Sequence, residues 1–268
     1  LEEVSTLPDM QKILDSFKVS LILITGVSSE LEVINELFLM ETIRLAKEYG
    51  IVSFLDDAYG ARLRPIIYGQ PKTLATGVDI GITSCDKAGL GGPRAGLMAG
   101  RSDLMSRVIA RAGELGLEAR PPLSLGVCAS LANFDPSQLR SEVELGEKIY
   151  EQLGKRFGKE RIKRTGLGAT IPEDDAWELV QDLRPRGEKV PFVPAEITAG
   201  IGIYWLERYG MITVNALGQP GARVSLRFKP DPREVERFGG ISALIEAIDD
   251  GLRYIAEKAG SLAEMKQL

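Results

Sequence analysis

Residues 19–26 read Val-Ser-Leu-Ile-Leu-Ile-Thr-Gly, an apolar run that ends at a glycine and predicts a buried strand. Residues 35–49 follow with apolar side chains at helical spacing, and Gly50 ends that helix. A second apolar run, Ile51 to Leu55, comes directly afterwards. A helical crossover of this kind joins parallel strands, and strands buried on both faces have continuous apolar sequences. The sequence therefore predicts an α/β fold with a mostly parallel sheet.

A third strand is predicted over residues 78–83 and a fourth over residues 94–99. Only residues 84–93 separate them, and a parallel crossover takes about a dozen residues or more. We therefore expect the fourth strand to run antiparallel to its neighbour. Helical patterns follow at residues 102–115, 123–134 and 136–154, the last of which opens with an Asp-Pro pair.

The pattern changes after this long helix. Short strands are predicted near residues 190–193, 210–215 and 222–228, with helices near residues 195–208 and 240–258. These elements indicate a smaller α+β unit. We place a partial large domain at residues 1–135, and the linking helix with a small C-terminal domain at residues 136–268.

Charge and composition exclude several classes of chemistry. The 268 residues include 33 Lys and Arg and 38 Asp and Glu, a net charge of −5 that argues against a broad nucleic-acid-binding face. Histidine is absent, which excludes His-dependent serine triads and His-ligated zinc among these residues, and we expect no metal site. Proton transfer must then use Lys, Asp, Glu, Tyr or Cys.

The remaining composition indicates a cytoplasmic protein. Cys85 and Cys128 are too few for a disulfide framework, which favours a reducing compartment. No apolar run of about 18 residues and no charged-then-apolar leader is present, so we expect no membrane partner. The chain begins with Leu1 rather than Met, directly before a helical pattern, and we expect it to lack an upstream segment.

Two carboxylates follow the second predicted strand. Residues 54–60 read Phe-Leu-Asp-Asp-Ala-Tyr-Gly, so an apolar strand delivers Asp56 and Asp57 at its carboxyl end, where ligands bind in open α/β sheets. A structural alternative is a turn made by Asp57 and Gly60 with Asp56 as its cap. Taken alone, the motif favours the turn.

A lysine in a glycine-rich loop follows the third predicted strand. Residues 83–96 read Thr-Ser-Cys-Asp-Lys-Ala-Gly-Leu-Gly-Gly-Pro-Arg-Ala-Gly, and the glycines allow close backbone approach. A single lysine in such a loop is usually solvated. This lysine, Lys87, instead shares a sheet edge with Asp56, and a hydroxyl at Ser84 precedes it by three residues.

The two motifs together resemble the cofactor site of fold-type I pyridoxal-phosphate enzymes, which pair an Asp-x-Ala-[His/Tyr] strand end with a Ser-x-x-Lys loop. More narrowly, residues 84–96 resemble the loop of bacterial selenocysteine synthase (L-seryl-tRNA selenium transferase) and its uncharacterised archaeal relatives. The resemblance covers residues 1–135 well and the remainder loosely. It implies an aspartate aminotransferase-like large domain with its N-terminal part missing, and a homodimer or higher homo-oligomer.

The resemblance also assigns roles in the binding of pyridoxal 5′-phosphate. Lys87 would form a Schiff base with the cofactor aldehyde. Asp56, rather than Asp57, would keep the ring nitrogen protonated, so that the ring acts as an electron sink. Tyr59 would reach the phenolic oxygen of the cofactor, and Ser84 would bind its phosphate.

Several arginines are further candidates. Arg94 is a cationic neighbour that would lower the pKa of the lysine amine, and Arg62 and Arg64 are candidates for anionic contacts. In several relatives a strand arginine precedes an acidic-hydrophobic pair by eleven residues, and Arg223 stands at that distance before Glu234. Arg223 is therefore the preferred ligand of a substrate carboxylate and Arg227 the second choice, although both fit a solvated edge strand equally well.

We expect a pyridoxal-phosphate-dependent transferase or lyase that acts on a small amino acid by elimination or replacement at Cβ. An aminotransferase is the nearest alternative. From other classes, a non-catalytic α/β scaffold and a tRNA-binding protein that uses the basic run 155–164 also stay open. In the relatives, a preceding segment of about a hundred residues, the size of a small domain, supplies most of the phosphate site.

Overall fold

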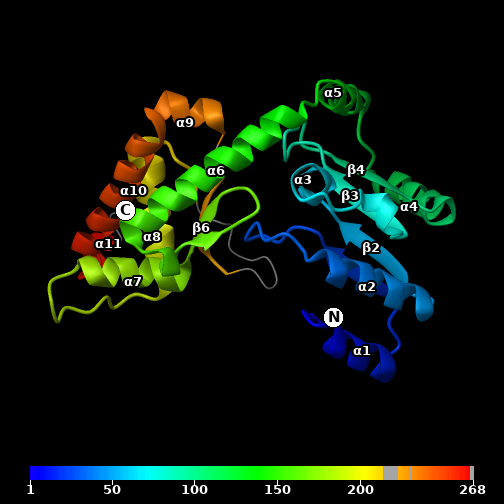
Figure 1. Ribbon diagram of the computed structural model, residues 1–268, viewed down its shortest axis with the longest axis horizontal. Coiled ribbons are helices and arrows are strands. Elements are labelled where there is room, and N and C mark those ends of the chain that lie inside the picture. The colour runs from blue at the N-terminus through cyan, green and yellow to red at the C-terminus, as the bar shows by residue number, and fades with distance from the viewer. Residues whose placement is uncertain (214–222, 230, 266–268) are drawn as a thin grey trace. The chain divides into compact units, whose positions relative to one another are not determined.

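The computed structural model describes residues 1–213, 223–229 and 231–265, which form two compact units (Figure 1). Unit 1 contains residues 1–28 and 32–140, and unit 2 contains residues 29–31 and 141–268. The sequence placed the boundary ahead of the long helix, between residues 135 and 136. In the structure, the division falls inside that helix, between Arg140 and Ser141.

Unit 1 is built on a four-stranded sheet. Its strands, in the order in which they lie, are β1 (Leu21–Thr25), β2 (Val52–Asp56), β3 (Ile80–Ser84) and β4 (Gly96–Gly100). β1 pairs in parallel with β2 and β2 with β3, whereas β4 runs antiparallel to β3. The expected α/β class and the antiparallel direction of the fourth strand are both confirmed.

The sequence predicted helices of unit 1 at residues 35–49, 102–115 and 123–134, and the structure has a helix at each place, whereas the helix over residues 60–67 was not predicted. The helices of this unit are α1 (Leu7–Ser16), α2 (Glu36–Glu48), α3 (Gly60–Ile67), the 3-10 helix η1 (Thr73–Thr76), α4 (Ser102–Leu115) and α5 (Pro121–Ala132). Asn35 caps α2, because its side chain accepts a hydrogen bond from the backbone of Phe38 at 3.1 Å. Leu39 and Ile43 of α2 pack on Ile24 of β1, which buries one face of the sheet.

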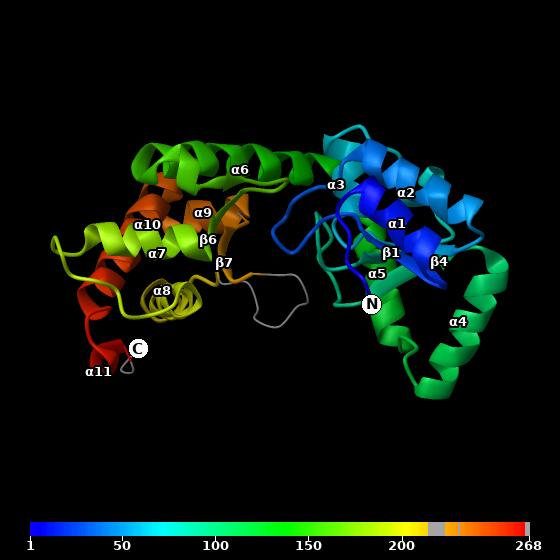
Figure 2. The ribbon, with the colours of Figure 1, turned by 90° about the horizontal axis from the view of Figure 1, so that it is seen from below.

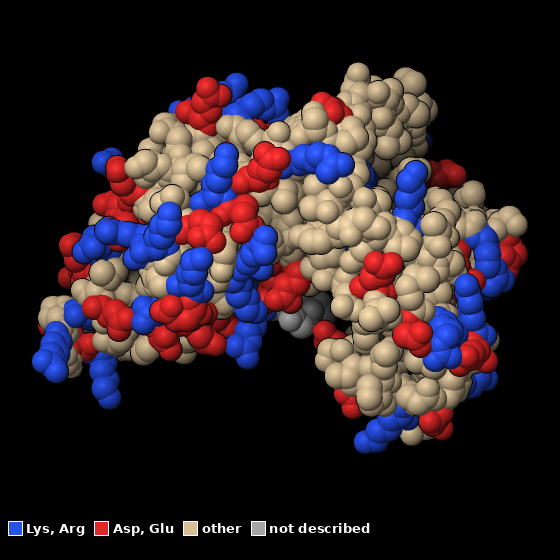
Figure 3. All heavy atoms as spheres, in the orientation of Figure 1, with Lys and Arg blue, Asp and Glu red and all other residues tan. Residues whose placement is uncertain are grey.

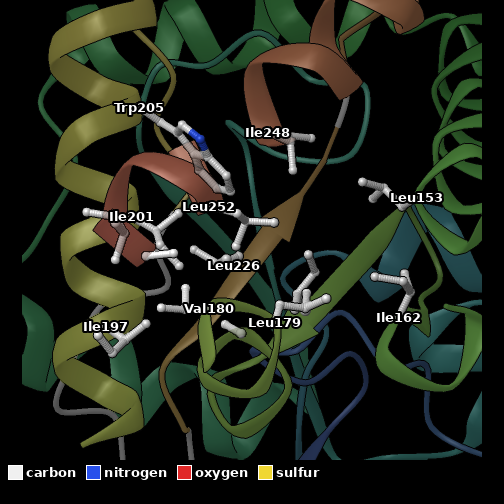
Figure 4. Packing of buried hydrophobic residues seen from close by; sticks show 14 of the residues in the cluster. Leu153, Ile162, Leu179, Val180, Ile197, Ile201, Trp205, Leu226, Ile248 and Leu252 are labelled. Carbon is white, nitrogen blue, oxygen red and sulfur yellow. The ribbon is translucent and has the colours of Figure 1, made fainter. Parts of the chain in front are cut away.

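Unit 2 combines a small antiparallel sheet with a helical layer. It holds most of α6 (Pro136–Phe157), η2 (Lys159–Arg161), β5 (Lys163–Arg164), β6 (Ala169–Pro172), α7 (Glu173–Leu183), α8 (Pro194–Tyr209), β7 (Ser225–Phe228), α9 (Pro232–Phe238), α10 (Gly240–Lys258) and α11 (Leu262–Met265). Helices α7, α8 and α10 pack together (Figure 2), and the side chains of Trp205, Leu226 and Leu252 are fully buried among them (Figure 4). No helix among the described residues is long and apolar enough to cross a bilayer.

Unit 2 departs from the sequence prediction in its strands. Residues 190–193 form no strand, because side chains of α7 take their backbone groups: Gln181 accepts from Val190 N at 2.9 Å, and Trp177 donates to Phe192 O at 2.8 Å. Part of the strand expected over 210–215 lies outside the described residues. β5, β6 and α7 were not predicted at all.

A buried ion pair holds the turn between β2 and α3. Arg64 Nε lies 3.0 Å from Asp57 Oδ1 and Arg64 Nη2 lies 2.5 Å from Oδ2, with both side chains fully buried. The Thr73 hydroxyl donates to Asp57 Oδ2 at 2.6 Å. Two glycines make room for the carboxylate, since a Cβ on Gly26 or Gly60 would lie 2.3 or 1.9 Å from Asp57 Oδ1. The anionic contact expected for Arg64 is therefore made inside the protein, to Asp57, and its guanidinium is buried rather than open to a ligand.

We predict that Arg64→Met lowers the free energy of unfolding by about 3–5 kcal/mol, because it leaves the Asp57 carboxylate buried without its cation. Urea unfolding followed by circular dichroism measures the change. Arg44→Met is the matched control, since Arg44 pairs with Glu41 and Glu48 on the exposed face of α2 and its loss should change little. Equal stability of the two variants would contradict the assignment.

Candidate active site

The two sequence motifs meet at one edge of the unit 1 sheet. β2 and β3 are parallel neighbours, so Asp56 at the end of one lies beside the loop that follows the other. A hollow of about 310 Å³ opens there. Its lining residues are Asp56, Ala58, Ile82, Thr83, Ser84, Asp86, Lys87, Arg94, Ala95 and Gly96. The structure thus brings together Asp56, Ser84 and Lys87, as the sequence predicted.

Only one of the two adjacent carboxylates faces this hollow. Asp56 is the last residue of β2, is half-buried, and accepts a hydrogen bond from Ala58 N at 3.2 Å. Asp57 is buried in its ion pair and is not among the lining residues. Successive side chains of an extended segment point to opposite sides, so Asp57 is buried in the core and Asp56 faces the hollow.

Lys87 lies beside an aromatic ring. Its Nζ is 5.2 Å from the centroid of the Tyr59 ring, within the range of a cation–π contact. Tyr59 directly precedes α3, so the strand end after Asp56 also supplies this ring. Tyr59 is therefore next to the lysine, although it is not one of the residues that line the hollow.

Asp86 is a site residue that the sequence analysis did not single out. Its carboxylate accepts a hydrogen bond from Ser84 Oγ and lies 4.0 Å from Arg94 Nε. The Arg94 side chain is 95% exposed, its described ion-pair partner is this acid, and both residues line the hollow. The place of Asp86 directly before Lys87 was the only signal in the sequence that could have found it.

The sequence suggested an anionic contact for Arg62, but the described hydrogen bonds of its side chain go to neutral acceptors. Its side chain is buried, burial lowers its pKa, and its guanidinium donates to backbone carbonyls and one hydroxyl. Cys85 in the same loop is also buried, and burial raises the pKa of its thiol. Neither side chain lines the hollow.

The two arginines predicted to bind a substrate carboxylate belong to unit 2, whereas the hollow is lined by unit 1. Arg223 lies just before β7 with its side chain 70% exposed, and its Nη1 is 3.0 Å from Asp174 Oδ2. Arg227 lies within β7, and its Nη1 donates to Ser29 O at 2.7 Å. Their role in substrate binding stays a prediction.

The basic run 155–164 has acidic partners. Five of its six basic side chains form ion pairs: Arg156 with Asp249 at 2.7 Å, Lys159 with Glu151 at 3.0 Å, Arg161 with Asp182 at 2.6 Å, Lys163 with Glu30 at 3.1 Å and Arg164 with Glu147 at 2.7 Å. On the face drawn in Figure 3, blue and red side chains are likewise intermixed over this unit. Such local neutralisation removes support from the tRNA-binding alternative.

The fold of the chain is that of the fold-type I pyridoxal-phosphate enzymes. A solved structure of SepCysS with the N-terminal domain of SepCysE matches 90% of this chain and 62% of its own, with a TM-score of 0.58 and 17% identity. Aspartate aminotransferase from Thermotoga maritima matches 93% of this chain and 60% of its own, with a TM-score of 0.56 and 16% identity. At such identities the likeness establishes the fold alone.

At the level of sequence, the chain is similar to proteins described as UPF0425 pyridoxal phosphate-dependent proteins. It is 34% identical to the one from Methanothermobacter thermautotrophicus over 93% of this chain, and 31% identical to the one from Methanosphaera stadtmanae over 88%. The chain spans 62% and 61% of the lengths of these two relatives. No protein-family model matches it.

Proposed function

We propose that this chain is part of a pyridoxal-phosphate-dependent enzyme, a transferase or lyase that acts on a small amino acid at Cβ. The observation that carries the proposal is the meeting of Asp56 and Lys87 at one hollow at the carboxyl ends of two parallel strands. The sequence relatives are described as pyridoxal phosphate-dependent proteins, which supports the assignment of this cofactor. The likeness of the Lys87 loop to selenocysteine synthase supports reaction at Cβ.

The side chains around the hollow fit the chemical groups of this cofactor. Lys87 would hold its aldehyde carbon covalently, and Asp56 would accept a hydrogen bond from its ring nitrogen. Tyr59 would lie near the phenolic oxygen. Ser84 has one hydroxyl proton, which it now donates to Asp86, so it would donate to the phosphate only after leaving that acid. When bound, the cofactor supplies an electron sink for a carbanion of the substrate.

The substrate side of the proposal rests on Arg223, with Arg227 as the second choice. A guanidinium can bind a carboxylate through two parallel hydrogen bonds. For Arg223 this requires exchange of Asp174 for the substrate carboxylate, which the exposure of both side chains allows. For Arg227 it requires release of the Ser29 carbonyl.

An aminotransferase is the second candidate function, because the same cofactor also supports amino transfer. The reactions differ in what they consume. Elimination from L-serine yields pyruvate and ammonia with no second substrate, and replacement at Cβ requires an added nucleophile and yields a new amino acid. Amino transfer requires a 2-oxo acid and converts it to an amino acid. Assay of all three sets of products distinguishes them, and a non-catalytic scaffold would give none.

We predict that borohydride reduction in the presence of pyridoxal phosphate attaches the cofactor mass to Lys87, and that Lys87→Ala abolishes both this adduct and the visible absorbance. The physical reason is that Lys87 is the amine at the hollow. Peptide mass spectrometry and absorbance spectra measure the outcome. Lys72→Ala, at an exposed lysine of the same unit, should behave as wild type. The cofactor mass on another lysine would overturn the site assignment.

A second prediction separates the two neighbouring carboxylates. Asp56→Ala should keep the adduct on Lys87 but lower turnover at least tenfold, because the ring nitrogen loses its charge-assisted hydrogen bond. Asp57→Ala should instead lower the urea midpoint, since it breaks the buried pair with Arg64. If Asp57→Ala lost turnover at normal stability while Asp56→Ala remained active, the two roles would have to be exchanged.

A third prediction concerns Arg223. Arg223→Gln should raise KM for the amino-acid substrate about tenfold or more with little change in cofactor absorbance, because a hydrogen bond to a charged group contributes about 1.5–3 kcal/mol. Steady-state kinetics and the absorbance spectrum provide the two readouts. Arg233→Gln is a control on an exposed arginine paired only with Asp231 among the described ion pairs. An unchanged KM would mean that Arg223 is a solvated residue of an edge strand, and Arg227 would then be tested.

A further inference from the structure

We propose that Arg62 is a positioning residue that holds Lys87 in place for the cofactor. The inference rests on the proposed function, but its structural basis is separate from it. Arg62 lies on α3, is buried, and touches neither the hollow nor the lysine amine. It acts instead on the backbone that carries Lys87.

The guanidinium of Arg62 bonds to both strand-end motifs at once. Nη2 donates to Ser84 O at 2.8 Å and to Lys87 O at 2.9 Å, and Nε donates to Ala88 O at 3.0 Å. Nη1 donates to the Thr83 hydroxyl at 3.0 Å. A weaker contact at 3.4 Å reaches Ala58 O, in the motif of Asp56. One side chain therefore ties the turn after β2 to the beginning and the end of the loop after β3.

This arrangement requires the planar, many-donor head of arginine. A guanidinium has five N–H donors in a fixed plane, whereas a lysine ammonium has three donors around one point. A guanidinium can therefore reach carbonyls spread from residue 84 to residue 88 at once, whereas an ammonium cannot. The charge alone, which both side chains share, would not reproduce the contacts.

The backbone next to the lysine shows why it needs this support. Ala88 has φ 49°, in the left-handed region that side chains other than glycine rarely adopt, and Gly89 follows with φ 82°. The carbonyl that precedes Ala88, that of Lys87, and the carbonyl of Ala88 itself both accept from Arg62. Without these bonds the chain would relax from the unfavourable conformation. The direction in which the Lys87 side chain leaves the backbone would change with it.

A well-placed amine reacts faster with an aldehyde than a mobile one, because its orientation has already been fixed. Arg62 thus contributes to the site by holding Lys87 above the Tyr59 ring and at the wall of the hollow. The companion arginine of α3, Arg64, holds the turn that presents Asp56. One helix supports both parts of the proposed cofactor site with two differently directed arginines.

The test compares Arg62→Lys with Arg64→Lys, two buried arginines of one helix of which only the first contacts the lysine loop. Hydrogen exchange of residues 84–92 is measured without cofactor. The rate of Lys87 labelling by pyridoxal phosphate is measured by borohydride trapping and mass spectrometry. Both are recorded at a temperature at which circular dichroism shows the variants to be folded. We expect Arg62→Lys to speed exchange and slow labelling at least tenfold each, and Arg64→Lys to leave the exchange of this loop near the wild-type rate.

The proposal would be overturned if Arg62→Lys left hydrogen exchange and the rate of Lys87 labelling unchanged. It would also be overturned if both variants changed these two rates equally, in proportion to their loss of stability. If Arg62→Lys does not fold, Thr83→Val removes one Arg62 bond together with the weaker bond from the Thr83 hydroxyl to Ala58 O at 3.4 Å. Because Thr83 also lines the hollow, hydrogen exchange of residues 84–92 alone then decides the question, by a smaller increase in rate or by none. A wild-type chain that pyridoxal phosphate does not label on Lys87 contradicts the proposed function. The exchange data then still decide whether Arg62 holds the loop.

Discussion

The buried pair of Asp57 and Arg64 is the constraint on which the candidate site depends. A charged pair without solvent is stable only when its geometry is good and its remaining hydrogen bonds are made. Thr73 and the two guanidinium contacts satisfy the carboxylate, and Gly26 and Gly60 leave it the space. The end of β2 and the start of α3 are thereby held at one point, and the neighbouring Asp56 is left at the sheet edge.

The hollow follows from this constraint and from the parallel sheet. Parallel strands place their carboxyl ends side by side, so residues far apart in the sequence reach the same edge. Helix α3 then stabilises that edge from within, with Arg64 on the turn after β2 and Arg62 on the loop after β3. Asp86 and Arg94 add a pair of opposite charges to the lining of the hollow, next to the hydroxyl of Ser84.

The reliability of the sequence prediction differed between the two units for physical reasons. In unit 1, the apolar runs of β1 to β3 and the amphipathic helices α2 and α4 were recognisable in the sequence, and the short spacing before β4 was enough to predict its antiparallel direction, whereas α3 was not predicted. In unit 2, β5 and β6 are two and four residues long, too short for any periodicity. The apolar residues 190–193 resembled a strand, but side chains of α7 bond their backbone instead.

The sequence by itself determined the α/β class, and its motifs indicated which residue types would meet at the sheet edge. It could not decide which of two adjacent aspartates faces that edge or which arginines are free to bind a ligand. Those choices depend on burial, which is a property of the packed chain: Asp57, Arg62 and Arg64 are enclosed by residues from other elements, and Asp56 is not. A buried charge must find its partner inside the protein, whereas an exposed one can bind a ligand. The same residue type therefore has different chemistry in the two environments.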